Sequence, residues 1–130
     1  MAQFHKKIFI LASLLAVITI AIGAFGAHGL KNLVDAPAVA SFETGVRYQM
    51  YHVFALFMVG LMPAISPQSR KWVTIFFLLG ILFFSGSIYL LALQSQLPFS
   101  VRFLGPVTPL GGLLFIMGWL RLGYGIYRAK

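Results

Sequence analysis

The stretch IFILASLLAVITIAIGAFGA, Ile8–Ala27, decides the fold, because no charged side chain interrupts it. A helix of about 20 apolar residues spans the roughly 30 Å hydrocarbon core of a bilayer. The run is longer than the apolar part of a secretory signal, which is typically about 7–15 residues. It therefore predicts a permanent membrane-spanning helix rather than a cleaved leader.

The whole chain has ten basic and two acidic residues, and none of them lies in this stretch. They border three further uncharged runs, each about as long as a helix needs to be to cross a membrane. With 60% hydrophobic residues, the chain has no room for a separate soluble domain. We predict an all-α, integral membrane four-helix bundle in a single domain, residues 1–130. The expected spans are about 8–27, 48–65, 72–93 and 106–120.

Two connecting segments carry local signals of their own. Asp35 followed by Pro37 is typical of a helix start, and Glu43 and Arg47 have the spacing of a helical ion pair. We therefore expect a short interfacial helix over about 36–46. Prolines and glycines gather near the start of the fourth span and predict a kinked or partly unwound helix there. They are Pro106, Pro109, Gly111 and Gly112.

The distribution of positive charge predicts the orientation. Most basic residues fall on the side of both termini, which the positive-inside rule places in the cytoplasm. They are Lys6, Lys7, Arg70, Lys71, Arg121, Arg128 and Lys130. Because these residues sit singly or in pairs at span ends, membrane phospholipid is the expected partner and nucleic acid is not. Trp119, with Tyr124 and Tyr127, is expected in an aromatic belt.

Polar residues inside the predicted spans concentrate in the outer half. They include His28, Tyr48, Gln49, His52, Ser85, Tyr89 and Thr108. Tyr48 and Gln49 lie four and three residues before His52, so the three share one helical face. Unpaired polar groups cost several kcal/mol each in hydrocarbon, so these residues must bond to one another or surround a ligand. The sequence leaves both interpretations open: interhelical hydrogen bonding, or a ligand-binding pocket.

Several chemical classes fit poorly. The chain contains no cysteine, and no carboxylate lies within a predicted span. A proton-coupled exporter usually needs such a carboxylate, and a hydrolase based on His52 would need a nucleophile and an orienting acid beside it. A haem or metal site using His28 and His52 would lack further ligands inside the spans. We predict no catalytic residues, no metal, no cofactor and no enzymatic activity.

Four motifs carry a resemblance to a known family. They are Gly23-Ala24-Phe25-Gly26-Ala27-His28; Phe42-Glu43-Thr44-Gly45 with Tyr48, Gln49 and His52; Phe84-Ser85-Gly86-Ser87 with Tyr89; and Pro106-Val107-Thr108-Pro109-Leu110-Gly111-Gly112 with Gly118-Trp119. The chain resembles the domain of unknown function 423 family, which includes eukaryotic relatives such as transmembrane protein 256. The resemblance implies a four-span protein of the bacterial cytoplasmic (inner) membrane and names no activity.

Three functions are compatible with these features. The first is binding of a lipid, quinone or small amphiphile in an outer-leaflet pocket formed by the polar residues named above. The second is a structural or assembly role, with a membrane-protein partner or a second copy docking on the small residues Ala12, Ala16, Gly23 and Ala27. The third is transport, which the apolar inner half disfavours.

Overall fold

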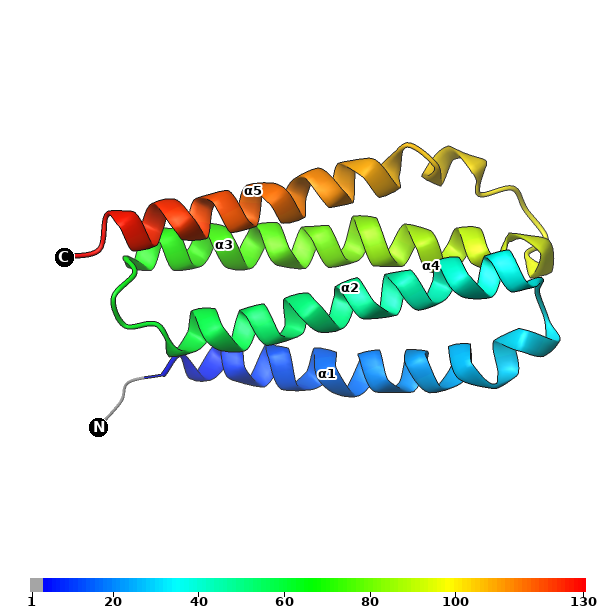
Figure 1. The fold of residues 1–130 in the computed structure, drawn as a ribbon, viewed down its shortest axis with the longest axis horizontal. Helices are drawn as coiled ribbons and strands as arrows, with labels where there is room; N and C mark the ends of the chain where they lie inside the picture. The colour runs from blue at the N-terminus through cyan, green and yellow to red at the C-terminus, as the bar shows by residue number, and fades with distance from the viewer. Residues whose placement is uncertain (1–3) are drawn as a thin grey trace.

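The computed structural model describes residues 4–130, which form four long helical rods lying side by side (Figure 1). The α-helices are α1 (Lys6–Ala27), α2 (Ala36–Leu61), α3 (Pro67–Gly80), α4 (Gly86–Ala92) and α5 (Val107–Tyr127). A π-helical turn, Ile81–Ser85, joins α3 and α4 into one rod. Short 3-10 turns occupy Gly29–Asn32, Gln94–Gln96 and Arg102–Leu104. The prediction of an all-α chain with four long helices is confirmed.

Three of these rods are long and apolar enough to cross a membrane: Lys6–Asn32, Pro67–Ala92 and Arg102–Tyr127. The fourth, α2, is of similar length but carries Arg47, Gln49 and His52. It lies between α1 and the α3–α4 rod along its whole course (Figure 1). Helix α2 thus packs against two of the three candidate spans.

The start of α2 differs from the prediction. The Asp35 carboxylate accepts a hydrogen bond from the Ala38 backbone N–H at 3.0 Å, and Pro37 lies in the first turn. From there the helix continues without a break to Leu61, so the segment 36–46 is the first part of α2 and not a separate interfacial helix. Ending a helix in or near lipid would leave backbone groups unpaired, and no proline in this segment forces such an end.

The buried Arg70 organises the turn between α2 and α3. Its guanidinium donates to the carbonyl oxygens of Val59, Met62 and Ile65, and the residue is only 6% exposed. The last carbonyls of a helix lack partners within that helix, so an arginine from α3 completes the end of α2. Ser66 in turn caps α3 by accepting a bond from the Ser69 N–H.

The fourth rod is regular where we expected a kink. Helix α5 is α-helical from Val107 onward, with Pro106 as its N-cap and Pro109 in its first turn. Prolines at these positions cost little, because the first N–H groups of a helix have no partner within it. The irregular backbone lies before the helix, and the departure from α-helical geometry inside a rod is the π turn at Ile81–Ser85.

The buried face of α5 explains the glycines. Its buried residues recur every three or four positions, which is the spacing of a packing seam. They are Gly111, Phe115, Gly118, Leu122 and Gly125. A Cβ added to Gly118 would lie 2.6 Å from the Phe77 ring, and one on Gly111 would lie 2.2 Å from the Phe84 backbone nitrogen. Small residues at such a seam allow the close helix packing that stabilises proteins in lipid.

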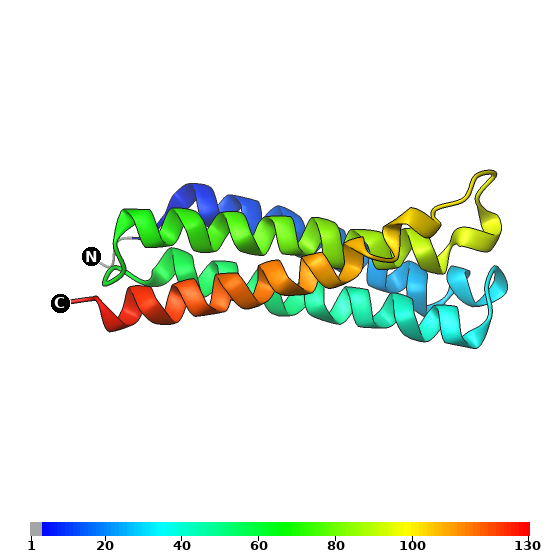
Figure 2. The ribbon, with the colours of Figure 1, turned by 90° about the horizontal axis from the view of Figure 1, so that it is seen from above.

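The rods are staggered, and all four contribute to one apolar cluster. At the end where α1 begins and α5 ends, Figures 1 and 2 place α1 and α3 on one side and α2 and α5 on the other. Toward the opposite end, α5 crosses to the side of the α3–α4 rod (Figure 2). Helix α1 packs mainly on α2, α2 packs on the α3–α4 rod, and α5 packs on α3 and the π turn. Grooves lie between α2 and α5 and between α1 and α3. Helix α1 begins and α5 ends at the same end of the molecule (Figure 1).

Candidate functional site

A layer of buried polar side chains separates two apolar clusters. The first cluster contains Ala12, Ala55, Leu56, Val59, Ile65, Val73, Phe77, Ile81, Phe115 and Leu122. The second contains Leu30, Val39, Phe42 and Ala92. Between them lie Thr19, Gln49, His52 and Ser85, which are 0–4% exposed. We call these four residues the polar layer.

Gln49 links three helices within this layer. The Tyr89 hydroxyl donates to Gln49 Oε1 at 2.7 Å, and Gln49 Nε2 donates to Thr19 Oγ1 at 2.8 Å. The Thr19 hydroxyl donates onward to the Leu15 carbonyl at 2.6 Å. These bonds join α1, α2 and α4 and satisfy polar groups that would be costly in hydrocarbon. The Gln49 amide is therefore committed to partners inside the protein.

The π turn brings a second bond into the layer. Ser85 Oγ donates to the Gly45 carbonyl oxygen at 2.7 Å. A π turn adds one residue to a helical turn and so rotates everything that follows it. Ser85 and Tyr89 both reach α2 from the segment that begins with this turn. A Cβ on Gly45 would lie 2.8 Å from the Tyr89 ring, so glycine is needed for this approach.

His52 bonds in a different direction, toward α5. The Trp119 indole Nε1 donates to His52 Nε2 at 3.0 Å, and His52 Nδ1 lies 2.7 Å from the Tyr48 carbonyl oxygen. An indole N–H can only donate, so Nε2 is the acceptor and Nδ1 carries the proton. The ring also stacks on Phe115, with centroids 3.6 Å apart and planes inclined by 8°. His52 is thus a neutral imidazole held in one orientation.

The depth of these groups corrects the sequence prediction. We expected His52 in the outer half, about one turn below a span starting near Tyr48. Because α2 begins at Ala36, His52 lies about 24 Å from its start and about 14 Å from its end. Trp119 lies about 18 Å and 12 Å from the two ends of α5, well inside the helix rather than in an end belt. The pair therefore lies well inside both helices.

A cleft of about 570 Å³ opens between α2 and α5 beside this pair. Its lining residues are Tyr48, His52, Pro109, Gly112, Leu113, Phe115, Ile116 and Trp119. His52 and Phe115 are buried, at 4% exposed each. Tyr48 and Trp119 are 41% and 43% exposed. The cleft therefore offers an imidazole, an indole N–H and aromatic faces to a molecule arriving from the side of the helices.

The seven site residues predicted from the sequence fall into separate groups. Gln49, Ser85 and Tyr89 bond within the protein, and Tyr48 and His52 line the cleft. Thr108 pairs with Ser87 at 2.6 Å. His28 follows the last residue of α1, is exposed, and lies near the Ala24 carbonyl at 3.0 Å. The structure therefore does not bring His28 to the depth of His52.

Sequence reasoning missed two residues of the site. Thr19 accepts from Gln49, and its signal was one of two hydroxyls, with Ser13, in the otherwise apolar interior of α1. Trp119 bonds to His52, but an aromatic residue near the end of a predicted span is ordinarily an interfacial anchor. Its actual role depends on which helices are neighbours, and hydropathy carries no information on that point.

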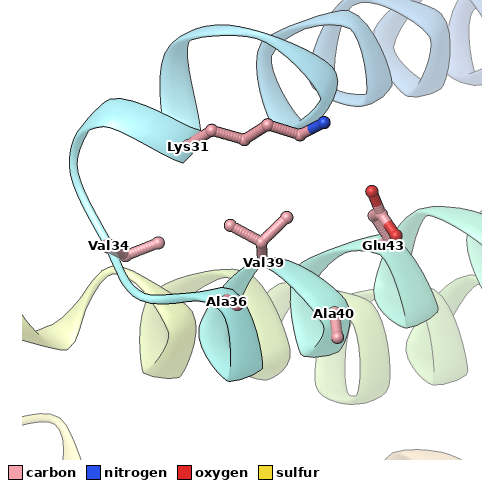
Figure 3. A pocket seen from close by; sticks show the side chains of 6 residues that line it. All are labelled: Lys31, Val34, Ala36, Val39, Ala40 and Glu43. Atoms are coloured by element: carbon pink, nitrogen blue, oxygen red, sulfur yellow. The ribbon is translucent and has the colours of Figure 1, made fainter.

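A smaller pocket of about 400 Å³ lies at the loop end of α1 and α2 (Figure 3). The Lys31 and Glu43 side chains border it from opposite sides, above an apolar floor that includes Val39. The expected pair between Glu43 and Arg47 is replaced by a bond from Arg47 Nη2 to Thr44 Oγ1 at 3.0 Å. Exposed side chains of opposite charge can close on each other by rotation, so this pocket does not by itself identify a ligand.

Comparisons with known proteins agree with this architecture. A UPF0382 membrane protein of Staphylococcus saprophyticus is 41% identical over 123 residues, covering 95% of this chain and 98% of the relative. A UPF0382 membrane protein of Haemophilus influenzae is 36% identical, with 96% and 97% covered. The UPF0382 membrane protein YwdK of Bacillus subtilis is 35% identical, with 90% and 93% covered.

No solved structure matches this one. The family model described as protein of unknown function (DUF423) matches residues 22–112, which include α2, the π turn and the start of α5. The predicted resemblance is therefore confirmed, and the chain belongs to the DUF423 family of small membrane proteins.

Proposed function

We propose that this chain is a non-catalytic protein of the bacterial cytoplasmic membrane that binds a lipid, quinone or small amphiphile in the cleft between α2 and α5. The observation that carries the proposal is the His52–Trp119 hydrogen bond at the wall of that cleft. The amide of Gln49 and the hydroxyl of Ser85 are committed to internal partners. The His52–Trp119 pair, in contrast, borders open space.

The chemistry of the pair favours a ligand with a hydroxyl or carbonyl group. A hydroxyl group can accept from the Trp119 N–H and donate to His52 Nε2 at the same time, replacing one hydrogen bond by two. A quinone carbonyl can accept from Trp119 alone. In the dry interior of a membrane, such bonds favour a ligand that matches them over a plain hydrocarbon chain.

The surroundings of the cleft favour access from the bilayer. Leu113 and Ile116 lie on its rim and are 51% and 57% exposed. Exposed aliphatic side chains on a spanning helix face lipid tails. A ligand dissolved in the membrane can therefore reach His52 without crossing water, and its ring can pack against Tyr48 and Trp119.

An assembly role is the second candidate, with a membrane-protein partner or a second copy, but part of its predicted surface is occupied. Ala12 is fully buried, and a Cβ added to Gly23 would meet Val46 of α2. Ala16 is half-buried and Ala27 is exposed, so these two positions remain available to a partner. Transport, the third candidate, is disfavoured by Leu56, Val59 and Phe77, which are 0% exposed and fill the interior toward the basic end.

Fluorescence quenching tests the proposal, because the chain has two tryptophans. The Trp72→Phe variant, in phosphatidylcholine nanodiscs, leaves Trp119 as the reporter and is titrated with decylubiquinone. We expect saturable quenching by the quinone. Adding His52→Leu removes the acceptor that competes with the quinone carbonyl for the Trp119 N–H, so the half-saturation concentration should fall about tenfold, which corresponds to one hydrogen bond. Native mass spectrometry of wild type and His52→Leu then identifies any co-purified amphiphile that depends on the cleft.

The Trp119→Phe variant is the matched control, since it leaves Trp72 at the start of α3. Trp72 does not line the cleft, so its quenching should rise linearly with quinone concentration. Equal, linear quenching of both tryptophans, together with a half-saturation concentration unchanged by His52→Leu, would remove the basis of the proposal.

A further inference from the structure

A second site lies at the basic end of the molecule, in the groove between α1 and α3. This pocket has a volume of about 380 Å³. Its lining residues are His5, Ile8, Pro67, Arg70, Lys71, Thr74 and Ile75. We propose that it binds the headgroup phosphate of an anionic phospholipid, with the acyl chains lying along α1 and α3.

The charge of the pocket is one-sided. Lys71 and Arg70 contribute positive charge, and no acidic residue among residues 4–130 lines the space. The Arg70 guanidinium is fixed by carbonyl oxygens of the α2–α3 turn, so its charge is already in place before a ligand arrives. Basic pockets between membrane helices on the cytoplasmic side are the usual sites of anionic headgroups.

An unpartnered hydroxyl provides an independent observation. Within residues 4–130, Thr74 Oγ1 is the buried side-chain polar atom that has no hydrogen-bond partner. Thr74 lines this pocket, about one helical turn deeper than Arg70 and Lys71. A buried hydroxyl in lipid is costly without a partner, and a phosphate oxygen supplies a strong acceptor. The hydroxyl thus points to a ligand below the basic side chains.

The apolar residues of the pocket fit a lipid better than a free anion. Ile8 and Ile75 line it from α1 and α3, where an acyl chain would follow the groove. The His5 backbone N–H bonds to the Gly60 carbonyl at 3.0 Å and holds this end of α1 in place. Phosphate contact and acyl-chain contact are therefore available in one site.

Native mass spectrometry with added lipids tests the proposal on the full chain. The probes are phosphatidylglycerol and phosphatidylcholine with identical acyl chains, and inorganic phosphate as the headgroup alone. We expect phosphatidylglycerol to be retained about fivefold or more over phosphatidylcholine. The variants Lys71→Gln and Thr74→Val should each lower its retention several-fold.

The matched control is Lys7→Gln, which removes a charge at the same end outside the pocket. It should retain phosphatidylglycerol as the wild type does. An equal loss in Lys7→Gln would show general attraction to a basic surface and overturn the site. Equal retention of both lipids, or competition by millimolar inorganic phosphate, would overturn the lipid assignment. Each of these results leaves the cleft between α2 and α5 untouched.

Discussion

Gln49 illustrates what the sequence predicts about a single residue and what it does not. Helical spacing placed Gln49 and His52 on one face and identified both as buried polar groups, and each is less than 5% exposed. Their partners, Thr19 and Trp119, come from α1 and α5 and were not predicted. Spacing along a helix fixes which side chains share a face, whereas the neighbouring helix determines what that face meets.

The Tyr89 hydroxyl provides a test of the polar layer. Tyr89→Phe removes one hydroxyl and leaves Gln49 Oε1 without its donor. We expect the free energy of unfolding to fall by about 1–2 kcal/mol, within the range for interhelical bonds in membranes. Unfolding in mixed detergent and dodecyl sulfate micelles, followed by circular dichroism, measures the change.

Tyr51→Phe is the matched control, because Tyr51 lies on α2 and is 56% exposed. Its free energy of unfolding should stay within about 0.5 kcal/mol of the wild type. Equal losses in the two variants would mean that the Gln49–Tyr89 bond contributes nothing specific.

At the scale of elements, α5 departs most from expectation. Glycine and proline weaken an isolated helix, so their concentration near 106–112 predicted an irregular start. In the structure Pro106 is the N-cap and Pro109 lies in the first turn, and Gly111 and Gly118 lie in the seam against α3 and the π turn. Tertiary packing outweighs helix propensity here, because the glycines make close contact possible. Composition alone does not distinguish a seam from a break.

Two glycines of α5 allow a matched comparison. Gly111→Ala places a methyl group against the backbone of Phe83 and Phe84, which cannot rotate away. We expect a loss of about 2–3 kcal/mol in the free energy of unfolding, as for other overpacked cores. Gly123→Ala meets nothing within 4 Å. It should leave stability unchanged or raise it by up to about 1 kcal/mol.

The same micelle unfolding experiment measures both substitutions. If Gly111→Ala proved as stable as Gly123→Ala, the result would contradict the close packing of α5 against the π turn.

At the scale of the whole molecule, hydropathy predicted the number of long helices. Because that number is even, it also predicted that the start of α1 and the end of α5 lie at the same end of the molecule. It did not predict the staggered arrangement, because apolar run length says nothing about which rods touch. The two grooves discussed above follow from that stagger: one between α2 and α5, the other between α1 and α3. Both candidate sites therefore depend on information that only the packed structure holds.

The orientation of the molecule is a prediction of the same scale. The natural chain contains no cysteine, so single cysteines can be introduced without background. With the basic end in the cytoplasm, Gln96→Cys should react with a membrane-impermeant maleimide on intact bacterial cells after removal of any outer membrane. Lys130→Cys should react only after the cytoplasmic membrane is permeabilised. The reverse pattern would invert the assignment.

The order of helix contacts has a consequence for biogenesis. Helix α1 packs mainly on α2, α2 on the α3–α4 rod, and that rod on α5, so most partners are neighbours along the chain. Contacts between sequence neighbours have a low entropic cost of closure and form early. The α1–α2 hairpin can therefore assemble while the ribosome is still synthesising α5, and the His52–Trp119 bond closes last, when the final helix arrives.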